Sequence, residues 1–278
     1  MSKKFILNFA PTGMIPTKHM TPYVPVAVDE IVEQAIEAVE LGANMVHLHA
    51  RDPDTAEPAY KKEFYAAIIR EIRSRFPKLI ICVTTSGRTF SEFEKRSEVL
   101  DLDGDLRPDF GSLTLSSLNF NQQASINSPQ MIQALAQKML ERGIRPEMEV
   151  FDLGMINYAR YLIRKGLIRP PYYFNLILGN IACAQANMLN LGLMINQLPD
   201  GAIWSAAGVG DTQLSMNIMA LISGGGIRVG LEDNIWLDSD RTVLATNRDL
   251  ILRIVKIADM MGFKPYSHEE ARRMLIGV

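Results

Sequence analysis

The chain has 278 residues, of which 47% are apolar and 22% charged, and its formal net charge is −2. This is the composition of an ordinary globular protein, and the near-neutral charge gives no reason to expect nucleic acid or an anionic membrane as a partner. No segment offers the roughly 20 uninterrupted apolar residues of a membrane span, and the N-terminal apolar run is too short for a signal peptide. Because Cys82 and Cys183 lie in apolar surroundings as two small core residues, we expect a reducing, cytoplasmic compartment.

Strand-like and helix-like segments alternate from end to end. The expected strands are short apolar runs, typical of a parallel sheet buried on both faces. They cover residues 5–10, 44–49, 79–84, 110–115, 147–151, 173–178, 202–206 and 227–231. Each is followed by a stretch with helical periodicity, at residues 29–41, 61–76, 91–99, 129–141, 155–165, 184–195, 212–222 and 246–261.

Eight such units without a linker predict one α/β domain over residues 1–278, a single (β/α)8 TIM barrel with a short extra C-terminal helix at 269–275. An open, doubly wound sheet is the alternative. The loop at 11–25 is long and contains four prolines, and long loops without secondary structure are usually functional. It follows the first strand, so we expect it over the barrel mouth.

The second strand carries His47 and His49, two of only four histidines. Residues two apart in a strand point to the same face, so these imidazoles can grip one metal ion. Alternatively, each ring is satisfied by a backbone carbonyl.

Active sites of barrels lie at the C-terminal strand ends. The third strand ends in Thr84-Thr85-Ser86-Gly87-Arg88, where the glycine lets a ligand approach the backbone, and the fourth offers Ser112. The fifth carries Glu147 and Glu149. A buried carboxylate is costly unless it is paired or used, and for Glu149 we favour proton transfer or ligand orientation over a salt bridge.

On the eighth strand, Arg228, Gly230 and Glu232 are expected to share one face. This strand closes onto the first, so Glu232 can complete a His-His-Glu set with an open position, the pattern of a catalytic zinc. Iron and other divalent ions suit the same ligands. Asp233 then projects beside the metal, where Arg228 can keep it ionised. The alternative is an ion network that ties the barrel shut.

A glycine-rich turn, residues 206–211, leads into the seventh helix. Backbone of this kind at a helix N-terminus binds anions, which favours a phosphorylated ligand.

Several segments together resemble the β-keto acid cleavage enzyme family, typified by 3-keto-5-aminohexanoate cleavage enzyme. They are Thr12-Gly13, His47-Leu48-His49, Thr84-Thr85-Ser86-Gly87, Pro146-Glu147-Met148-Glu149-Val150 and Gly230-Leu231-Glu232-Asp233-Asn234. The resemblance runs the whole chain and implies a zinc-dependent barrel, assembled as a homotetramer, that condenses a β-keto acid with acetyl-CoA to give acetoacetate and a new acyl-CoA. By this resemblance the zinc ligands are His47, His49 and Glu232, and the base is Asp233, assisted by Arg228. Thr84 and Glu149 would act in the site, and Ser112 and the Gly87 backbone would contact the substrate.

The chemistry is consistent with these residues. A β-keto acid can chelate a metal through its ketone and one carboxylate oxygen, which acidifies the C2 proton for a base such as Asp233. We expect the anion-binding turns near strands seven and eight to suit the CoA phosphates. Two other readings stay open: a metal-dependent aldolase or decarboxylase that acts without CoA, and a barrel that only binds a small molecule.

Ile15 marks a departure from the family's type enzyme, whose first loop carries a glutamate that recognises the substrate's amine. An ammonium group facing Ile15 loses its counter-charge at a partly desolvated site. We therefore expect a substrate whose tail is neutral or apolar.

Overall fold

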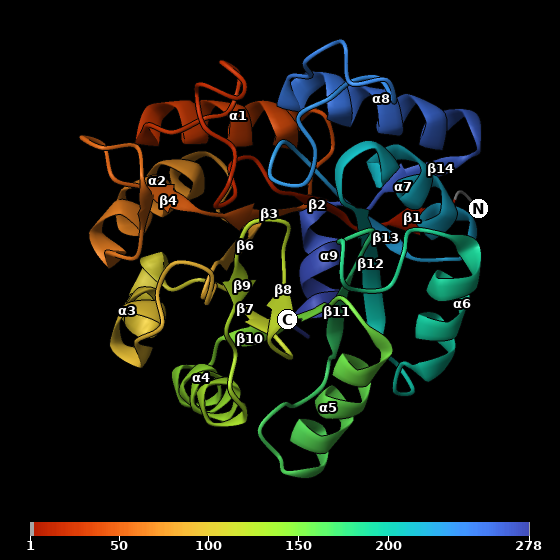
Figure 1. The fold of residues 1–278 in the computed structure, drawn as a ribbon. Coiled ribbons are helices and arrows are strands. Elements are labelled where there is room, and N and C mark those ends of the chain that lie inside the picture. Colours follow the sequence, from red (N-terminus) through yellow and green to blue (C-terminus); the bar gives the residue numbers. More distant parts are fainter. Residues whose placement is uncertain (1–2, 278) are drawn as a thin grey trace.

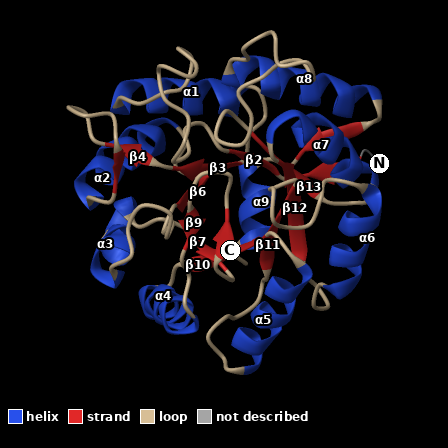
Figure 2. Cartoon of the chain, viewed as in Figure 1, coloured by secondary structure: helices blue, strands red, loops and turns tan. Residues whose placement is uncertain are grey.

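The computed structural model describes residues 3–277, and its centre is a closed barrel of eight parallel strands. These strands are β2 (Leu7–Phe9), β3 (Met45–Leu48), β6 (Ile80–Val83), β7 (Phe110–Thr114), β10 (Arg145–Val150), β11 (Tyr173–Leu178), β12 (Ile203–Gly208) and β13 (Gly226–Val229). Pairing of β13 with β2, in which Arg228 is opposite Asn8, closes the ring. Figure 2 shows the strands as an inner ring inside the helices. The predicted barrel is confirmed, and the open sheet is excluded.

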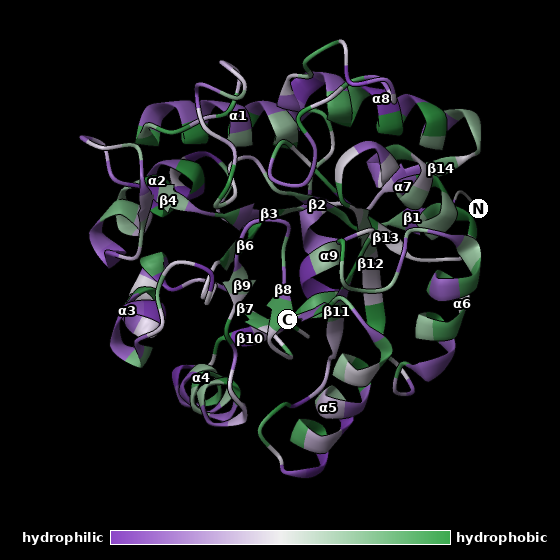
Figure 3. Cartoon of the chain, viewed as in Figure 1, coloured by the Kyte–Doolittle hydropathy of each residue, from purple (hydrophilic) through white to green (hydrophobic). Residues whose placement is uncertain are grey.

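Eight helices surround the barrel in chain order (Figure 1). They are α1 (Val28–Glu40), α2 (Lys62–Arg75), α3 (Phe93–Ser97), α4 (Pro129–Arg142), α5 (Leu153–Arg164), α6 (Met188–Gln197), α7 (Gln213–Ile222) and α8 (Asn247–Met260). Hydrophobic and hydrophilic residues alternate along them (Figure 3), as expected of helices with one face on a core. The N-terminus of α4 shows the local control: the Ser128 hydroxyl accepts a hydrogen bond from the Met131 amide at 3.1 Å.

Three predicted elements have other bounds in the structure. The helix expected at 91–99 is the five-residue α3, which continues as 3-10 turns at Glu98–Asp101 and Gly104–Leu106. The helix expected at 184–195 begins only at Met188, because the Asn187 side chain caps it. The first strand is split: β1 (Lys3–Phe5) pairs with β14 (Phe263–Pro265), and only β2 joins the barrel.

The two ends of the barrel differ. The C-terminal helix α9 (His268–Leu275) closes the N-terminal end, where Ala271 and Leu275 pack with Met45 and Phe110 in a separate buried cluster. Two short antiparallel pairs follow the opposite strand ends: β4 (Ala50–Arg51) with β5 (Pro58–Ala59), and β8 (Leu118–Asn119) with β9 (Ala124–Ser125). The polar residues at the C-terminal ends of the strands therefore lie at the open end of the barrel, which we call its mouth.

Among residues 3–277, none of the helices combines the length and the apolar character that crossing a membrane would demand.

Candidate active site and metal centre

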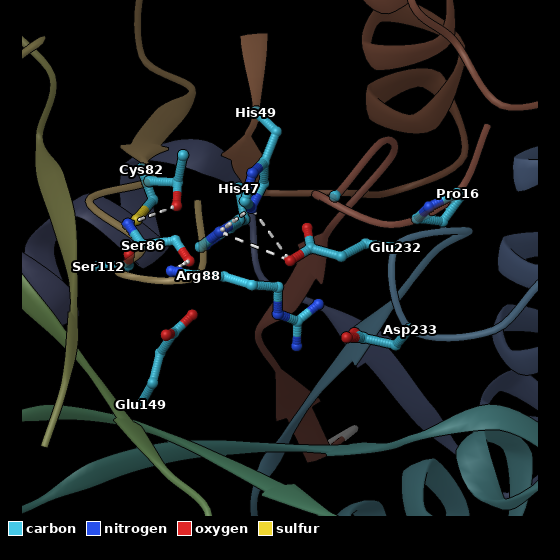
Figure 4. A network of polar contacts seen from close by, with 12 residues as sticks. Pro16, His47, His49, Cys82, Ser86, Arg88, Ser112, Glu149, Glu232 and Asp233 are labelled. Atoms are coloured by element: carbon cyan, nitrogen blue, oxygen red, sulfur yellow. Dashed lines mark hydrogen bonds and ion pairs between the residues drawn. The ribbon is translucent and has the colours of Figure 1, made fainter. Parts of the chain in front are cut away.

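His47, His49 and Glu232 meet at the barrel mouth, turned toward one another (Figure 4). The two histidine Nε2 atoms lie 3.3 Å apart. Glu232 Oε1 lies 3.1 Å from His49 Nε2 and 4.0 Å from His47 Nε2. The sequence prediction brought these three residues together, and the structure places them so.

This triangle has the dimensions of a metal site. Ligand atoms of a tetrahedral zinc ion stand about 3.3 Å apart, since each lies about 2.0–2.2 Å from the ion. Glu232 Oε2 is buried without a hydrogen-bond partner among the described residues. Burial lowers the pKa of His47, but the nearby carboxylates of Glu147 and Glu232 outweigh it and raise that pKa to about 9. At His49 burial dominates and lowers the pKa to about 4, so this imidazole is neutral, as a metal ligand must be. The two imidazoles and the Glu232 carboxylate fit a divalent cation.

Glu147 fixes the orientation of His47. Its carboxylate is fully buried and accepts hydrogen bonds from His47 Nδ1 at 2.5 Å and from Asn8 Nδ2 at 2.6 Å. A neutral His47 that donates from Nδ1 presents the Nε2 lone pair to the centre, the usual arrangement behind a metal-bound histidine. Glu147 was named in the sequence analysis, but no role was assigned to it. The available signal was its position two residues before Glu149, on the same face of a buried strand.

His47, Cys82 and Glu147 form a second cluster of possible ligands, but its geometry and chemistry fit hydrogen bonding. The 2.5 Å between His47 Nδ1 and Glu147 Oε2 is shorter than the separation of two zinc ligands. Burial and the neighbouring Glu147 raise the pKa of the Cys82 thiol well above its usual value, whereas a metal ligand must be a thiolate. Cys82 instead donates to Glu147 at 3.2 Å.

Glu232 reaches the histidines from a turn, which corrects the predicted strand at 227–231. β13 ends at Val229, and Gly230 follows with φ +152°, a conformation that favours glycine. A Cβ on Gly230 would lie 2.0 Å from the Ala10 carbonyl oxygen, and one on Gly13 would lie 2.6 Å from Glu232 Cγ. The two glycines therefore allow the turn and the first loop to approach closely enough to place Glu232.

Arg228 organises the carboxylates around this turn. Its guanidinium donates to Asp233 Oδ2 at 2.8 Å and lies 2.7 Å from Glu232 Oε1 and 3.6 Å from Glu149 Oε1. Thr114 Oγ1 also donates to Glu149, at 2.7 Å. Burial raises the pKa of both Glu149 and Asp233, opposed by Arg228. Ionised Asp233 is therefore a stronger base than an exposed carboxylate, and Arg228 holds it in place.

The remaining predicted residues separate into two groups. Thr84 and Ile15 line the main cavity, and the Ile15 side chain is 41% exposed. Ser112 and Gly87 do not contribute to the lining of that cavity. The Ser112 hydroxyl accepts from the Thr85 amide at 3.1 Å, and a Cβ on Gly87 would lie 2.6 Å from Arg96 Nη1.

The cavity has a volume of about 410 Å³ and opens at the barrel mouth. The loop at 11–25 lines one side, as predicted, and the β8–β9 hairpin lines another. Ser86, Arg88 and Phe120 also line it. The sequence placed Ser86 and Arg88 at this strand end without a role for either, and it gave no sign of Phe120. They lie in loops and in the hairpin, where side-chain direction follows no sequence period.

The glycine-rich turn offers less to an anion than expected. The Val209 amide donates to the Leu178 carbonyl at 2.9 Å, and the Gly210 amide donates to the Asp233 carbonyl at 2.7 Å. Both groups are used within the protein. Arg241 stands beside Gly210 at the cavity rim and pairs with Asp211 at 3.5 Å.

Comparison with known proteins places the chain in a family. The sequence profile of the beta-keto acid cleavage enzymes matches residues 4–276. The chain belongs to the beta-keto acid cleavage enzyme family. It is therefore an enzyme of that class, as the resemblance predicted.

Curated relatives match along nearly their whole length. The chain is 34% identical over 278 residues to the 3-keto-5-aminohexanoate cleavage enzyme of Fusobacterium nucleatum, covering 99% of this chain and 98% of the relative. It is 33% identical over 282 residues to the 3-oxoadipate:acetyl-CoA acetyltransferase of Cupriavidus necator, covering 100% and 96%. Among solved structures, apo ObcA superposes with a TM-score of 0.80 at 21% identity, over 91% of this chain and 65% of ObcA. The last match supports the fold alone.

Proposed function

We propose that this enzyme condenses a β-keto acid with acetyl-CoA and releases acetoacetate and a new acyl-CoA, with residues 1–278 acting as one catalytic domain. Two relatives whose names include acetyl-CoA match along nearly the full chain, the 3-oxoadipate enzyme and a 3-dehydrocarnitine:acetyl-CoA trimethylamine transferase of Rhizobium meliloti, 31% identical over 99% of this chain. The observation that carries the proposal is the convergence of His47, His49 and Glu232 beside an arginine-held Asp233.

A divalent ion held by His47, His49 and Glu232, zinc by its ligand set, supplies Lewis-acid activation of the keto acid when bound. The chain's own groups do the rest. Asp233, which lines the cavity, accepts the C2 proton of the keto acid. Arg228 keeps that carboxylate oriented through hydrogen bonds at 2.8 and 3.2 Å.

The remaining bond changes balance within the two substrates. The deprotonated C2 attacks the acetyl carbonyl carbon, and the CoA thiolate leaves. That thiolate then attacks the C3 ketone, the C2–C3 bond breaks, and the acyl group departs as acyl-CoA. We propose that Glu149, whose pKa is raised by burial, gives C2 of acetoacetate its proton in the last step, and that the proton held by Asp233 then passes to Glu149, which restores both carboxyl groups.

Ile15 narrows the substrate range of this proposal. Its apolar side chain lines the cavity, and it supplies no counter-charge to the amine of an aminohexanoate. We therefore propose that 3-keto-5-aminohexanoate is not the preferred substrate. Assembly as a homotetramer stays a prediction, which light scattering on the purified protein measures.

Isotope labelling tests the reaction. Incubation of a panel of β-keto acids with acetyl-CoA, 13C-labelled in both acetyl carbons, is expected to put both labels into C3 and C4 of acetoacetate and none into the new acyl-CoA. Product formation without acetyl-CoA would instead identify an aldolase or decarboxylase. His47→Ala is expected to lose both stoichiometric metal and activity. His268→Ala, at the closed end of the barrel, is the matched control.

A further inference from the structure

Arg88 is a charged residue of the cavity that has no role in the proposed reaction. It follows β6 and reaches into the middle of the site, between Glu149 on one side and Glu232 and Asp233 on the other (Figure 4). Its backbone amide donates to Ser86 Oγ at 3.3 Å. Its guanidinium carbon lies 3.3 Å from the centre of the Phe120 ring.

The acids that surround Arg88 already have other partners. Asp233 and Glu232 are held by Arg228, and Glu149 is held by Thr114 and Arg228. Among residues 3–277, no carboxylate approaches the Arg88 guanidinium within the 4.0 Å of an ion pair, since all the pairs at this site involve Arg228 or a histidine. Arg88 is therefore a half-buried cation without a counter-ion, and a cavity that keeps such a group is suited to an anion.

Phe120 holds this cation in place. It belongs to the β8–β9 hairpin, which the Asn180 side chain ties down by donating to the Asn119 carbonyl at 2.8 Å. The Phe120 ring also packs edge-on against Phe151, with ring centres 5.8 Å apart. A guanidinium that rests on an aromatic ring keeps its N–H groups free, and these match the two oxygens of a carboxylate.

The place of Arg88 indicates which anion it meets. It shares one cavity with His49, Glu232 and Asp233, and Glu232 is the acid whose charge acts on it most strongly. A keto acid held at the metal centre therefore brings its own carboxylate close to Arg88. That carboxylate is the one charged group common to all β-keto acids.

We infer that Arg88 is a substrate-binding residue that pairs with the carboxylate of the β-keto acid, and that Phe120 is its positioning residue. The inference rests on the proposed function.

The test compares an acid with its uncharged counterpart. Steady-state kinetics are measured for a β-keto acid and for its methyl ester, in the wild type, Arg88→Met, Arg88→Lys and Phe120→Leu. Arg88→Met is expected to raise KM for the acid about 10- to 100-fold, the effect of losing a charge-assisted hydrogen bond. KM for the ester and for acetyl-CoA should stay unchanged, and kcat for the acid should change little. Arg88→Lys should recover part of the loss.

Phe120→Leu should give a smaller rise in KM for the acid, and in the double variant it should add nothing to Arg88→Met. Arg164→Met, on the exposed surface of α5, is the matched control. Equal losses for acid and ester would overturn the inference in favour of a structural role. A raised KM for acetyl-CoA would also overturn it, as would a loss confined to dicarboxylic keto acids.

Equilibrium binding separates this inference from the proposed reaction. Calorimetry with acetoacetate and methyl acetoacetate on the metal-loaded protein requires no turnover. If the wild type prefers the acid and Arg88→Met does not, Arg88 binds the carboxylate even if the proposed transfer to CoA fails. If Arg88→Met keeps the preference, the inference is wrong whatever the reaction.

Discussion

Replacing Glu147 by glutamine isolates the role of charge behind the metal centre. One carboxylate oxygen faces His47 and Cys82, and the other faces the amides of Asn8 and Asn175. Within the described part of the chain, the carbonyl oxygens of both asparagines are buried without hydrogen-bond partners, so either amide can turn to accept from the new NH2 group. The variant can therefore fold with its carbonyl oxygen still on His47 Nδ1, and what it loses is the negative charge that makes His47 a stronger ligand.

The expected loss is tenfold to hundredfold in metal affinity, about 1.4 to 2.7 kcal/mol, the usual effect of removing a partner behind a metal-bound histidine. Competition with a chelator of known affinity measures it, and kcat/KM at saturating metal shows how much loss remains once the ion is bound. Glu63→Gln, exposed on α2, is the control. Unchanged affinity in Glu147→Gln would refute the view that this carboxylate tunes His47.

Cys82→Ala distinguishes a metal held by His47, His49 and Glu232 from one held by the second cluster, His47, Cys82 and Glu147. If the ion is held by His47, His49 and Glu232, loss of the thiol removes only a hydrogen bond to Glu147 at 3.2 Å, and the metal stays bound. If Cys82 were a ligand, affinity would fall as far as it does in His47→Ala.

Three further predictions test the frame of the site. Gly230→Ala should destabilise the protein by about 2–4 kcal/mol in urea unfolding, because a Cβ there would meet the Ala10 carbonyl oxygen at 2.0 Å. Gly154→Ala, with open space around it, is the control. Equal stability of the two variants would show that Gly230 is not needed for the turn. Ser128→Ala should cost about 1 kcal/mol in the same assay through loss of the α4 cap, and no change would show that the cap is dispensable. Ile15→Glu should raise kcat/KM for 3-keto-5-aminohexanoate relative to a neutral-tailed keto acid about tenfold; an unchanged ratio would remove Ile15 from the specificity argument.

The barrel could be predicted because its strands are buried on both faces. A strand buried on both faces is recognisable in the sequence as a short, mostly apolar run. An example is β11, where all six residues are buried. The elements that the sequence did not reveal depend on contacts distant in the chain. The first strand splits at Ile6 because Phe5 pairs with Pro265 on one side while Leu7 pairs with Ile227 on the other.

The candidate site was predictable where side chains follow a strand period and hidden where they do not. His47 and His49 belong together because they are two residues apart. Glu232 was expected beside them because it was assigned to one face of the eighth strand. In the structure it lies in a turn that depends on Gly230. Arg88 lies in a loop, and its guanidinium is positioned by stacking on the ring of the hairpin residue Phe120. No pattern in the sequence links those two positions.

β3 and β10 each contribute to the site at two depths. On β10, Glu147 lies below the cavity and Glu149 lines it; His47 lies below it in β3, and His49, which follows that strand, lines it. The lower histidine and glutamate bind each other at 2.5 Å, whereas the upper two face the space where substrate must sit. Substitution at the lower level should therefore act through metal affinity, and substitution of Glu149 through turnover at full metal occupancy. A Glu149→Gln variant that lost metal as readily as Glu147→Gln would show that the two glutamates of β10 do not have separate roles.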